Sequence, residues 1–269
     1  RPQGALLDVV DLERIEVLRG PQGTLYGKNT IGGAIKFVTK PLLPEFGAST
    51  TIAVGTYGQA DVKTSLNMPV GSDAVVARVS LASLHRDGFG ENRLNGQPVS
   101  DKEILVGRGT LGFYPNDNVS VLLSVDHMED QGGVRGGKRL NAFNAFDPLR
   151  TPPFDDRYDI QSGMPNVNDT TMDGASATIN WNIDEAWWFK SVTAYRESDT
   201  DTNIDFDMLP GKITDVRALY ADEQLSQEFQ FNYTGDRLTG VFGLYWFDGE
   251  AGGTVFNNLL NASFGTTNG

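Results

Sequence analysis

The feature that most constrains this 269-residue chain is a repeated alternation of polar and apolar side chains. Residues 61–70 and 118–126 place apolar side chains at every second position, with mostly polar ones between them, and residues 174–183 and 224–233 repeat the pattern. A period of two with one polar face is the signature of a β-strand, because successive side chains of a strand point to opposite sides of its sheet. We therefore predict a mainly β protein.

The connections between these segments alternate in length. Short turns are expected at residues 71–73, 115–117, 184–185 and 234–236, and long loops at residues 87–101, 130–172 and 200–219. Short turns on one side and long loops on the other are typical of an outer-membrane β-barrel. We count about nine strands of roughly 9 to 13 residues, enough to cross a bilayer when tilted. The alternative is a soluble β-sandwich, which would bury both faces of its sheets.

Composition excludes several other classes of protein. No run reaches the roughly 18 to 20 apolar residues of a membrane-spanning helix. A net charge of −13 without Lys and Arg clusters argues against nucleic-acid binding. The chain has no cysteine, so it has neither disulfides nor thiolate ligands. It begins with Arg1 and no signal segment follows, so we expect an interior piece of a longer chain.

Residues 11–41 read DLERIEVLRGPQGTLYGKNTIGGAIKFVTKP. Residues 14–18 and 34–38 alternate like short strands, and the glycines and proline between them permit tight reversals. This segment closely resembles the plug-domain signature of TonB-dependent outer-membrane receptors. Residues 226–231 and 243–248 resemble barrel strands of the same family. The matching plug positions are Arg14, Glu16, Arg19, Gly20, Pro21, Gln22, Gly23, Tyr26, Gly27, Gly32 and Gly33.

The resemblance implies a fragment of a large antiparallel transmembrane β-barrel with part of a small α+β plug domain inside its lumen. Wide barrels with a plugged lumen are known among outer-membrane transporters. On this basis residues 1–44 form the C-terminal part of the plug, and residues 45–269 form the N-terminal part of the barrel.

The resemblance also implies a function. Such a receptor takes up a scarce nutrient across the bacterial outer membrane, most commonly a ferric siderophore or another iron complex, and it is not an enzyme. Its partners are the TonB–ExbB–ExbD complex, reached through a segment expected before Arg1, the extracellular ligand and outer-membrane lipid. Uptake of carbohydrate or cobalamin is an alternative, and so is a passive porin-like channel, although porins lack the plug signature.

Two sets of residues are candidates for specific roles. In this family plug arginines pair with barrel glutamates, so we expect Arg19, and also Arg14, to pair with Glu228. The alternative is that Arg19 meets only carbonyl groups of the plug. The long loop at 130–172 mixes basic and aromatic side chains suited to an anionic ferric chelate, unless it is simply a solvated loop. Its candidates are Arg135, Lys138, Arg139, Phe143 and Phe146.

Other motifs give weaker indications of function. A phosphate-binding loop would need glycine at position 22 and Ser or Thr at position 29, where this chain has Gln22 and Asn29, so nucleotide binding is not expected. The only histidines, His85 and His127, stand far apart and lack a second ligand nearby. The acidic residues of the long loop suit a solvated surface better than a weak cation site; they are Asp155, Asp156 and Asp159. We expect no catalytic residues, no metal site and no cofactor.

Overall fold

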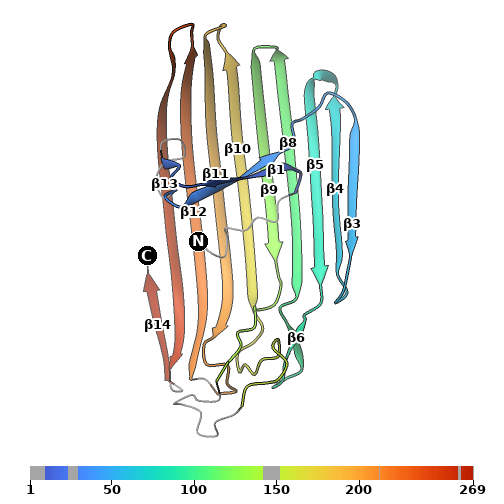
Figure 1. Cartoon of the computed structure of the whole chain (residues 1–269), viewed down its shortest axis with the longest axis vertical. Coiled ribbons are helices and arrows are strands. Elements are labelled where there is room, and N and C mark those ends of the chain that lie inside the picture. Colours follow the sequence, from blue (N-terminus) through green and yellow to red (C-terminus); the bar gives the residue numbers. More distant parts are fainter. Residues whose placement is uncertain (1–9, 24–29, 142–151, 212, 260–261, 269) are drawn as a thin grey trace.

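The main body of the protein is one large antiparallel sheet. The computed structural model describes residues 10–23, 30–141, 152–211, 213–259 and 262–268. Ten strands pair in the order β14-β13-β12-β11-β10-β9-β8-β5-β4-β3, which is an up-and-down arrangement (Figure 1). They are β3 (Gly47–Val54), β4 (Ala60–Val70), β5 (Ser72–Arg86), β8 (Lys102–Asn116), β9 (Val119–Asp130), β10 (Asn168–Asn182), β11 (Trp187–Asp205), β12 (Thr214–Thr234), β13 (Thr239–Leu259) and β14 (Ala262–Asn268).

We call this ten-stranded sheet the wall. It is a mainly β, antiparallel structure, as the alternation predicts. Two further pairs of strands lie outside it: β1 (Leu12–Arg19) with β2 (Gly33–Thr39), and the short hairpin of β6 (Gly90–Asn92) with β7 (Gln97–Val99).

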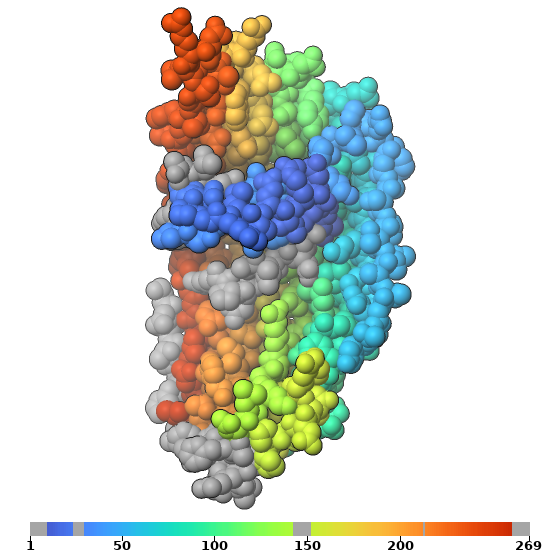
Figure 2. Space-filling view, viewed as in Figure 1, coloured from blue at the N-terminus to red at the C-terminus, as the bar shows by residue number. Residues whose placement is uncertain are grey.

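The β1–β2 pair crosses one face of the wall. Figure 1 shows it running over the strands at a steep angle, and Figure 2 shows it as a blue band across this face of the molecule. We call residues 10–23 and 30–45 the crossing segment. It is the segment that carries the plug signature.

The two faces of the wall differ in polarity. On β9, Leu123 and Val125 point away from the crossing segment and are 47% and 61% exposed, whereas Ser124 is buried. Phe113, Ile179 and Trp181 of neighbouring strands are likewise exposed. Large apolar side chains in a contiguous exposed band mark a surface that meets something other than water. The alternation read from the sequence thus divides an apolar outer face from a more polar inner face, which also carries a small buried apolar cluster.

The short turns fall where the alternation predicts them, after β4, β8, β10 and β12. The predicted loop at residues 200–219 is wrong in extent, because β11 continues to Asp205 and β12 begins at Thr214. Near its end, from Glu197 to Asn203, β11 has polar residues on both faces, so the alternation disappears there while the backbone pairing with β12 continues. The wall has ten described strands rather than about nine, and the last of them is β14.

No helix among the described residues is long and apolar enough to cross a membrane.

Candidate functional site

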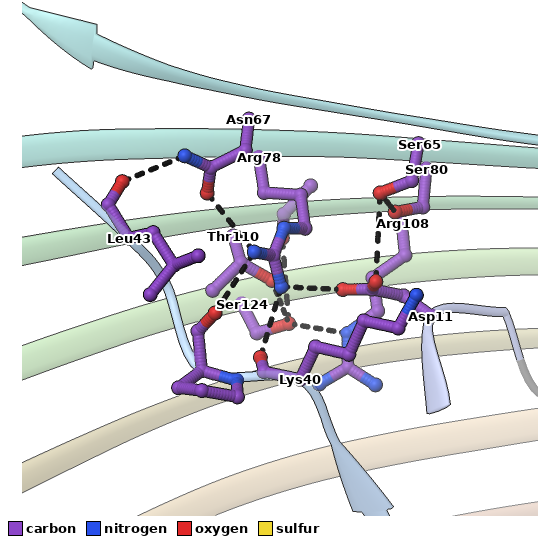
Figure 3. A network of polar contacts seen from close by, with 12 residues as sticks. Asp11, Lys40, Leu43, Ser65, Asn67, Arg78, Ser80, Arg108, Thr110 and Ser124 are labelled. Atoms are coloured by element: carbon purple, nitrogen blue, oxygen red, sulfur yellow. Dashed lines mark hydrogen bonds and ion pairs between the residues drawn. The ribbon is translucent and has the colours of Figure 1, made fainter. Parts of the chain in front are cut away.

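The crossing segment is held to the wall by a buried arginine. Arg78 projects from β5 and its side chain is only 7% exposed, as is that of Asp11. Its Nη1 donates to Asp11 Oδ2 and to the carbonyl oxygen of Lys40, both at 2.9 Å. Its Nη2 donates to the carbonyl oxygen of Pro41 at 2.8 Å (Figure 3). The planar guanidinium has enough donors for all three acceptors at once.

Asn67 extends this contact along the neighbouring strand. It lies opposite Arg78 in the register of β4 and β5, and its Oδ1 accepts from Arg78 Nη2 at 3.0 Å. Its Nδ2 donates to the carbonyl oxygens of Leu43 and Glu45, both at 2.7 Å. Arg78 and Asn67 together therefore bind backbone groups along residues 40–45, where the crossing segment leads into β3.

Asp11 brings the other end of the crossing segment to the same place. Its backbone has φ of 68°, a conformation that few non-glycine residues adopt but in which aspartate is enriched. The carbonyl oxygen of Asp11 accepts from the amide of Lys40 at 3.0 Å, and its carboxylate accepts from Ser65 Oγ at 3.5 Å. One wall arginine thus contacts residues on both sides of the β1–β2 hairpin.

An apolar contact lies beside the ion pair. Val10 is 4% exposed and packs with Ala82, Leu84, Val106 and Met128 of the inner face, together with Met172. Burial of a valine side chain contributes roughly 1.5 to 3 kcal/mol. Val10 and Asp11 therefore combine an apolar anchor with a charged one.

A second wall arginine provides a useful contrast. Arg108 of β8 also faces inward, opposite Ser80 in the register, and its Nε donates to Ser124 Oγ at 3.1 Å. Ser124 in turn contacts Thr110 Oγ1 and the carbonyl oxygen of Gly109, so these bonds stay within the wall (Figure 3).

The β1–β2 hairpin has the tight geometry that its glycines permit. The amide of Gly20 donates to Gly32 O at 3.3 Å, and that of Gln22 donates to Thr30 O at 3.0 Å, on either side of Pro21. Gly33 has φ of 140°, and a Cβ there would lie 2.3 Å from the carbonyl oxygen of Leu18. Gly23 ends the described part of β1's connection, and the signature residues Tyr26 and Gly27 lie outside the described residues.

The charged residues of the signature lie mainly on the hairpin itself. Arg14 bonds Glu16 at 2.7 Å and Glu13 at 2.9 Å, and all three are on β1. The hydrogen bond from Arg14, with a further contribution from Lys36 of β2, lowers the pKa of Glu16. Arg19 is exposed at the end of β1.

Glu228 lies on the inner face of β12, opposite Val192, and accepts a hydrogen bond from Gln230. The pairing of Arg19 or Arg14 with Glu228 stays a prediction. The ion pair that the structure does show between the crossing segment and the wall, Asp11 with Arg78, has the opposite polarity.

The loop candidates divide into three groups. Arg135 is exposed, and Arg139 is half-buried. Lys138 is engaged within the loop, because its Nζ donates to the carbonyl oxygens of Phe154 and Asp156 at 2.9 and 2.8 Å. Phe143 and Phe146 lie outside the described residues.

Sequence reasoning missed both Asp11 and Arg78. The signal was available on β5, where Arg78 lies between Val76 and Ser80 on the inward face. A charged residue flanked by buried neighbours needs a partner, because an unpaired buried charge is strongly unfavourable. The identity of that partner depends on the crossing segment, which the local pattern does not reveal.

Comparison with known proteins agrees with this arrangement. The family model for the TonB-dependent receptor plug domain matches residues 1–34. The metal-pseudopaline receptor CntO of Pseudomonas aeruginosa is 23% identical over 200 residues, which cover 72% of this chain and 26% of the relative. The pesticin receptor of Yersinia enterocolitica is 30% identical over 195 residues, covering 66% and 27%. The crystal structure of the ferric yersiniabactin uptake receptor FyuA from Yersinia pestis superposes with a TM-score of 0.80 at 19% identity, covering 96% of this chain and 39% of FyuA.

The chain is therefore similar to part of a TonB-dependent receptor. The relatives are named as receptors, and a further one is named an iron-regulated outer membrane virulence protein of Vibrio cholerae, 31% identical over 135 residues that cover 44% of this chain and 21% of that protein. In the superposition with FyuA the wall matches part of that protein, and the crossing segment carries the end of the plug signature. The chain spans about a quarter of the length of the curated relatives it matches. The boundary between plug and barrel at residue 44 stays a prediction.

Proposed function

We propose that the full-length protein is a TonB-dependent receptor that imports a metal, most commonly iron, as a complex with a small organic chelator such as a siderophore. The observation that carries the proposal is the crossing segment bound across the polar inner face of a wall whose outer face is apolar. An outer face of this kind suits lipid, and a segment across the inner face suits a lumen that must be opened to pass cargo.

The nature of the attachment supports active transport over a passive channel. Arg78 and Asp11 form a buried ion pair with further hydrogen bonds to Lys40 and Pro41. Breaking a buried pair by removing one partner costs about 3 to 5 kcal/mol. Displacing a plug anchored in this way requires work, which the TonB–ExbB–ExbD complex would supply through a segment outside this sequence.

The metal-complex class of cargo is supported by the relatives. Their names describe a metal-pseudopaline receptor and a ferric yersiniabactin uptake receptor, and both ligands are metal complexes. Basic side chains of the external loop suit an anionic complex. Arg135 is exposed there, whereas Lys138 holds the loop together and is a weaker candidate for ligand contact.

The experiment is an uptake assay on the full-length gene in its native host. Strains with and without the gene, each with and without TonB, are grown under iron limitation and supplied with labelled iron on a panel of siderophores. Gene-dependent and TonB-dependent uptake of at least one complex is the expected result. Labelled cobalamin and labelled oligosaccharide are measured in parallel.

Each other result points elsewhere. Uptake that persists without TonB would indicate a passive channel. TonB-dependent uptake of cobalamin or oligosaccharide, with no effect on any iron complex, would retain the receptor and overturn the proposed cargo. An Arg135→Ala variant with Asp155→Ala as a loop control separates ligand contact from a general effect on the loop.

A further inference from the structure

A cavity lies at the long-loop end of the wall, on strands β11, β12 and β13. Its volume is about 500 Å³, within the range of roughly 300 to 1,000 Å³ that small-molecule sites occupy. Asn203, Arg217 and Phe256 lie side by side on these strands and line it. Asp201 of β11 also lines it, and the loop before β10 contributes the apolar residues Met164 and Pro165.

The cavity is on the outer face of the wall, away from the crossing segment. Val125, Ala175 and Tyr195 form one row across β9, β10 and β11, and Val125 points outward. Asp201 and Asn203 follow Tyr195 at even spacings along the same paired strand, so they point outward as well. The cavity is therefore on the same face as the apolar band.

The position of the cavity along the strands places it well beyond the apolar band. Glu197, Glu223 and Glu250 form a charged row that ends the band on these strands. The strand from Glu197 to Asn203 spans about 20 Å, which is about 15 Å along the membrane normal at a tilt of about 40°. Phospholipid headgroups extend only about 5 to 8 Å beyond the hydrocarbon. A membrane lipid would therefore reach the cavity only through a much longer polar head.

The charged groups of the cavity neutralise each other. Arg217 Nε and Nη2 donate to Asp201 Oδ1 and Oδ2 at 3.0 and 2.6 Å, and the two side chains are 53% and 29% exposed. A guanidinium has N–H donors beyond these two, and a carboxylate can accept further hydrogen bonds. The pair therefore offers both donors and acceptors to a ligand, with no net charge to attract an ion.

Asn203 provides an acceptor that no described residue uses. Asn203 is 7% exposed, and its Nδ2 donates to Pro165 O at 3.0 Å. Its Oδ1 is buried and meets no hydrogen-bond donor among the residues that the structure describes. An unpaired buried oxygen is unfavourable. A hydroxyl group that enters from the cavity would satisfy it.

Phe256 adds an aromatic surface next to these polar groups. It is 44% exposed and lies opposite Arg217 in the register. A sugar ring has apolar C–H faces and a rim of hydroxyl groups that both donate and accept, so it matches an aromatic ring set beside paired donors and acceptors.

We propose that this cavity binds a sugar unit, and that the sugar belongs to the head of a glycolipid in the outer leaflet of the membrane. A glycolipid fits because the cavity is on the apolar side of the wall and lies beyond the reach of phospholipid headgroups. The inference rests on the part of the proposed function that places the outer face against lipid, and it is independent of the cargo.

The test uses the full-length receptor purified in detergent from the outer membrane of its native host. Failure to recover it from that membrane would contradict the proposed function before any sugar is added. The probe is the oligosaccharide released by mild acid from the lipopolysaccharide of the host, titrated by calorimetry. Intact lipopolysaccharide and maltoheptaose are titrated in parallel, to distinguish the sugar of a glycolipid from a free oligosaccharide.

The cavity variants are Phe256→Ala and Arg217→Gln, and each has a matched control at the same end of the protein. Phe206→Ala changes a phenylalanine that is 68% exposed and lies outside the cavity. Arg93→Gln changes an arginine that, like Arg217, is half exposed and pairs with an aspartate at 2.6 Å, also outside the cavity.

We expect the released oligosaccharide and the intact lipopolysaccharide to bind the unmodified receptor, and maltoheptaose to bind more weakly than either. Phe256→Ala and Arg217→Gln should each weaken oligosaccharide binding by roughly tenfold, whereas the two controls should bind like the unmodified receptor. Uptake of labelled iron complex should be the same in both cavity variants as in the unmodified receptor, because the cavity faces away from the crossing segment.

Three results would overturn the proposal. The first is no binding of the oligosaccharide at millimolar concentration to a receptor that still imports its iron complex. The second is binding that survives both cavity variants, or that falls equally in the controls, which would place the sugar elsewhere. The third is tighter binding of maltoheptaose than of the oligosaccharide, which would assign the cavity to a free oligosaccharide.

Discussion

Replacing Arg78 by methionine should release the crossing segment from the wall. The change keeps most of the apolar bulk of the side chain but leaves the Asp11 carboxylate, 7% exposed, with only the long contact from Ser65 among the residues that the structure describes. It also removes the donors to the carbonyl oxygens of Lys40 and Pro41. Loss of one partner from a buried pair costs about 3 to 5 kcal/mol.

Replacing Asp11 by asparagine should cost less. Arg78 would still donate to Lys40 O, Pro41 O and Asn67 Oδ1, and the asparagine oxygen can still accept one hydrogen bond. The expected cost is that of weakening a single charged hydrogen bond, about 1.5 to 3 kcal/mol. The two variants should differ in stability cost because Asp11 keeps only one weak partner among the described residues when Arg78 is removed, whereas Arg78 keeps three acceptors when Asp11 is changed.

Hydrogen exchange of the backbone amides in β1 and β2, measured by mass spectrometry on the full-length receptor, tests this. Since about 1.4 kcal/mol corresponds to a factor of ten, Arg78→Met should speed exchange of these amides by roughly a hundredfold to several thousandfold. Arg108→Met is the matched control, because Arg108 faces the same side but bonds within the wall. Equal exchange in the two arginine variants, or a larger effect from Asp11→Asn than from Arg78→Met, would refute the reasoning.

Three further predictions concern the hairpin and the outer face. Gly33→Ala should destabilise the β1–β2 pair by roughly 1 to 3 kcal/mol. The reason is that Gly33 has a φ of 140° and the new Cβ would meet the carbonyl oxygen of Leu18 on β1. Faster amide hydrogen exchange confined to β1 and β2 is the expected result. Leu123→Arg should lower the amount of protein recovered from the outer membrane, because an arginine on the lipid face costs about 2 to 4 kcal/mol. Leu122→Arg, on the inner face, should be tolerated. Equal amounts of the two variants would contradict the assignment of faces. Because the pKa of Glu16 is lowered below 4.5 by Arg14, its stabilisation of the hairpin is present above that pH and is lost as the pH falls through the lowered value. Protease protection of β1 should therefore fall on acidification, and Glu16→Gln should remove that dependence.

The strands, their faces and the short turns could be read from the sequence because they are set by local chemistry. A strand exposes alternate residues to opposite sides, so the inner and outer faces of β9 are already visible in the pattern around Leu123 and Ser124. The plug signature was equally accessible, because the reversals around Gly20 and Gly33 depend on backbone conformations that glycine permits.

The ends of the longest strands could not be read in this way. From Glu197 to Asn203 polar residues occupy both faces of β11, and only the backbone pairing with β12 defines the strand there, up to Asp205 opposite Asp215. The alternation that reveals a strand reports a difference between two environments, and here both environments are polar.

Contacts between segments far apart in the chain were decided only by the tertiary structure. Asp11 and Arg78 are separated by 67 residues, and nothing in either local pattern specifies the other. Asn203, Arg217 and Phe256 line one cavity only because the register of β11, β12 and β13 places them side by side. The sequence by itself determined where most strands lie and which of their faces are apolar. The pairing of charges depended on how the crossing segment and the loops pack, because burial and proximity, rather than residue type, decide which charges need a partner.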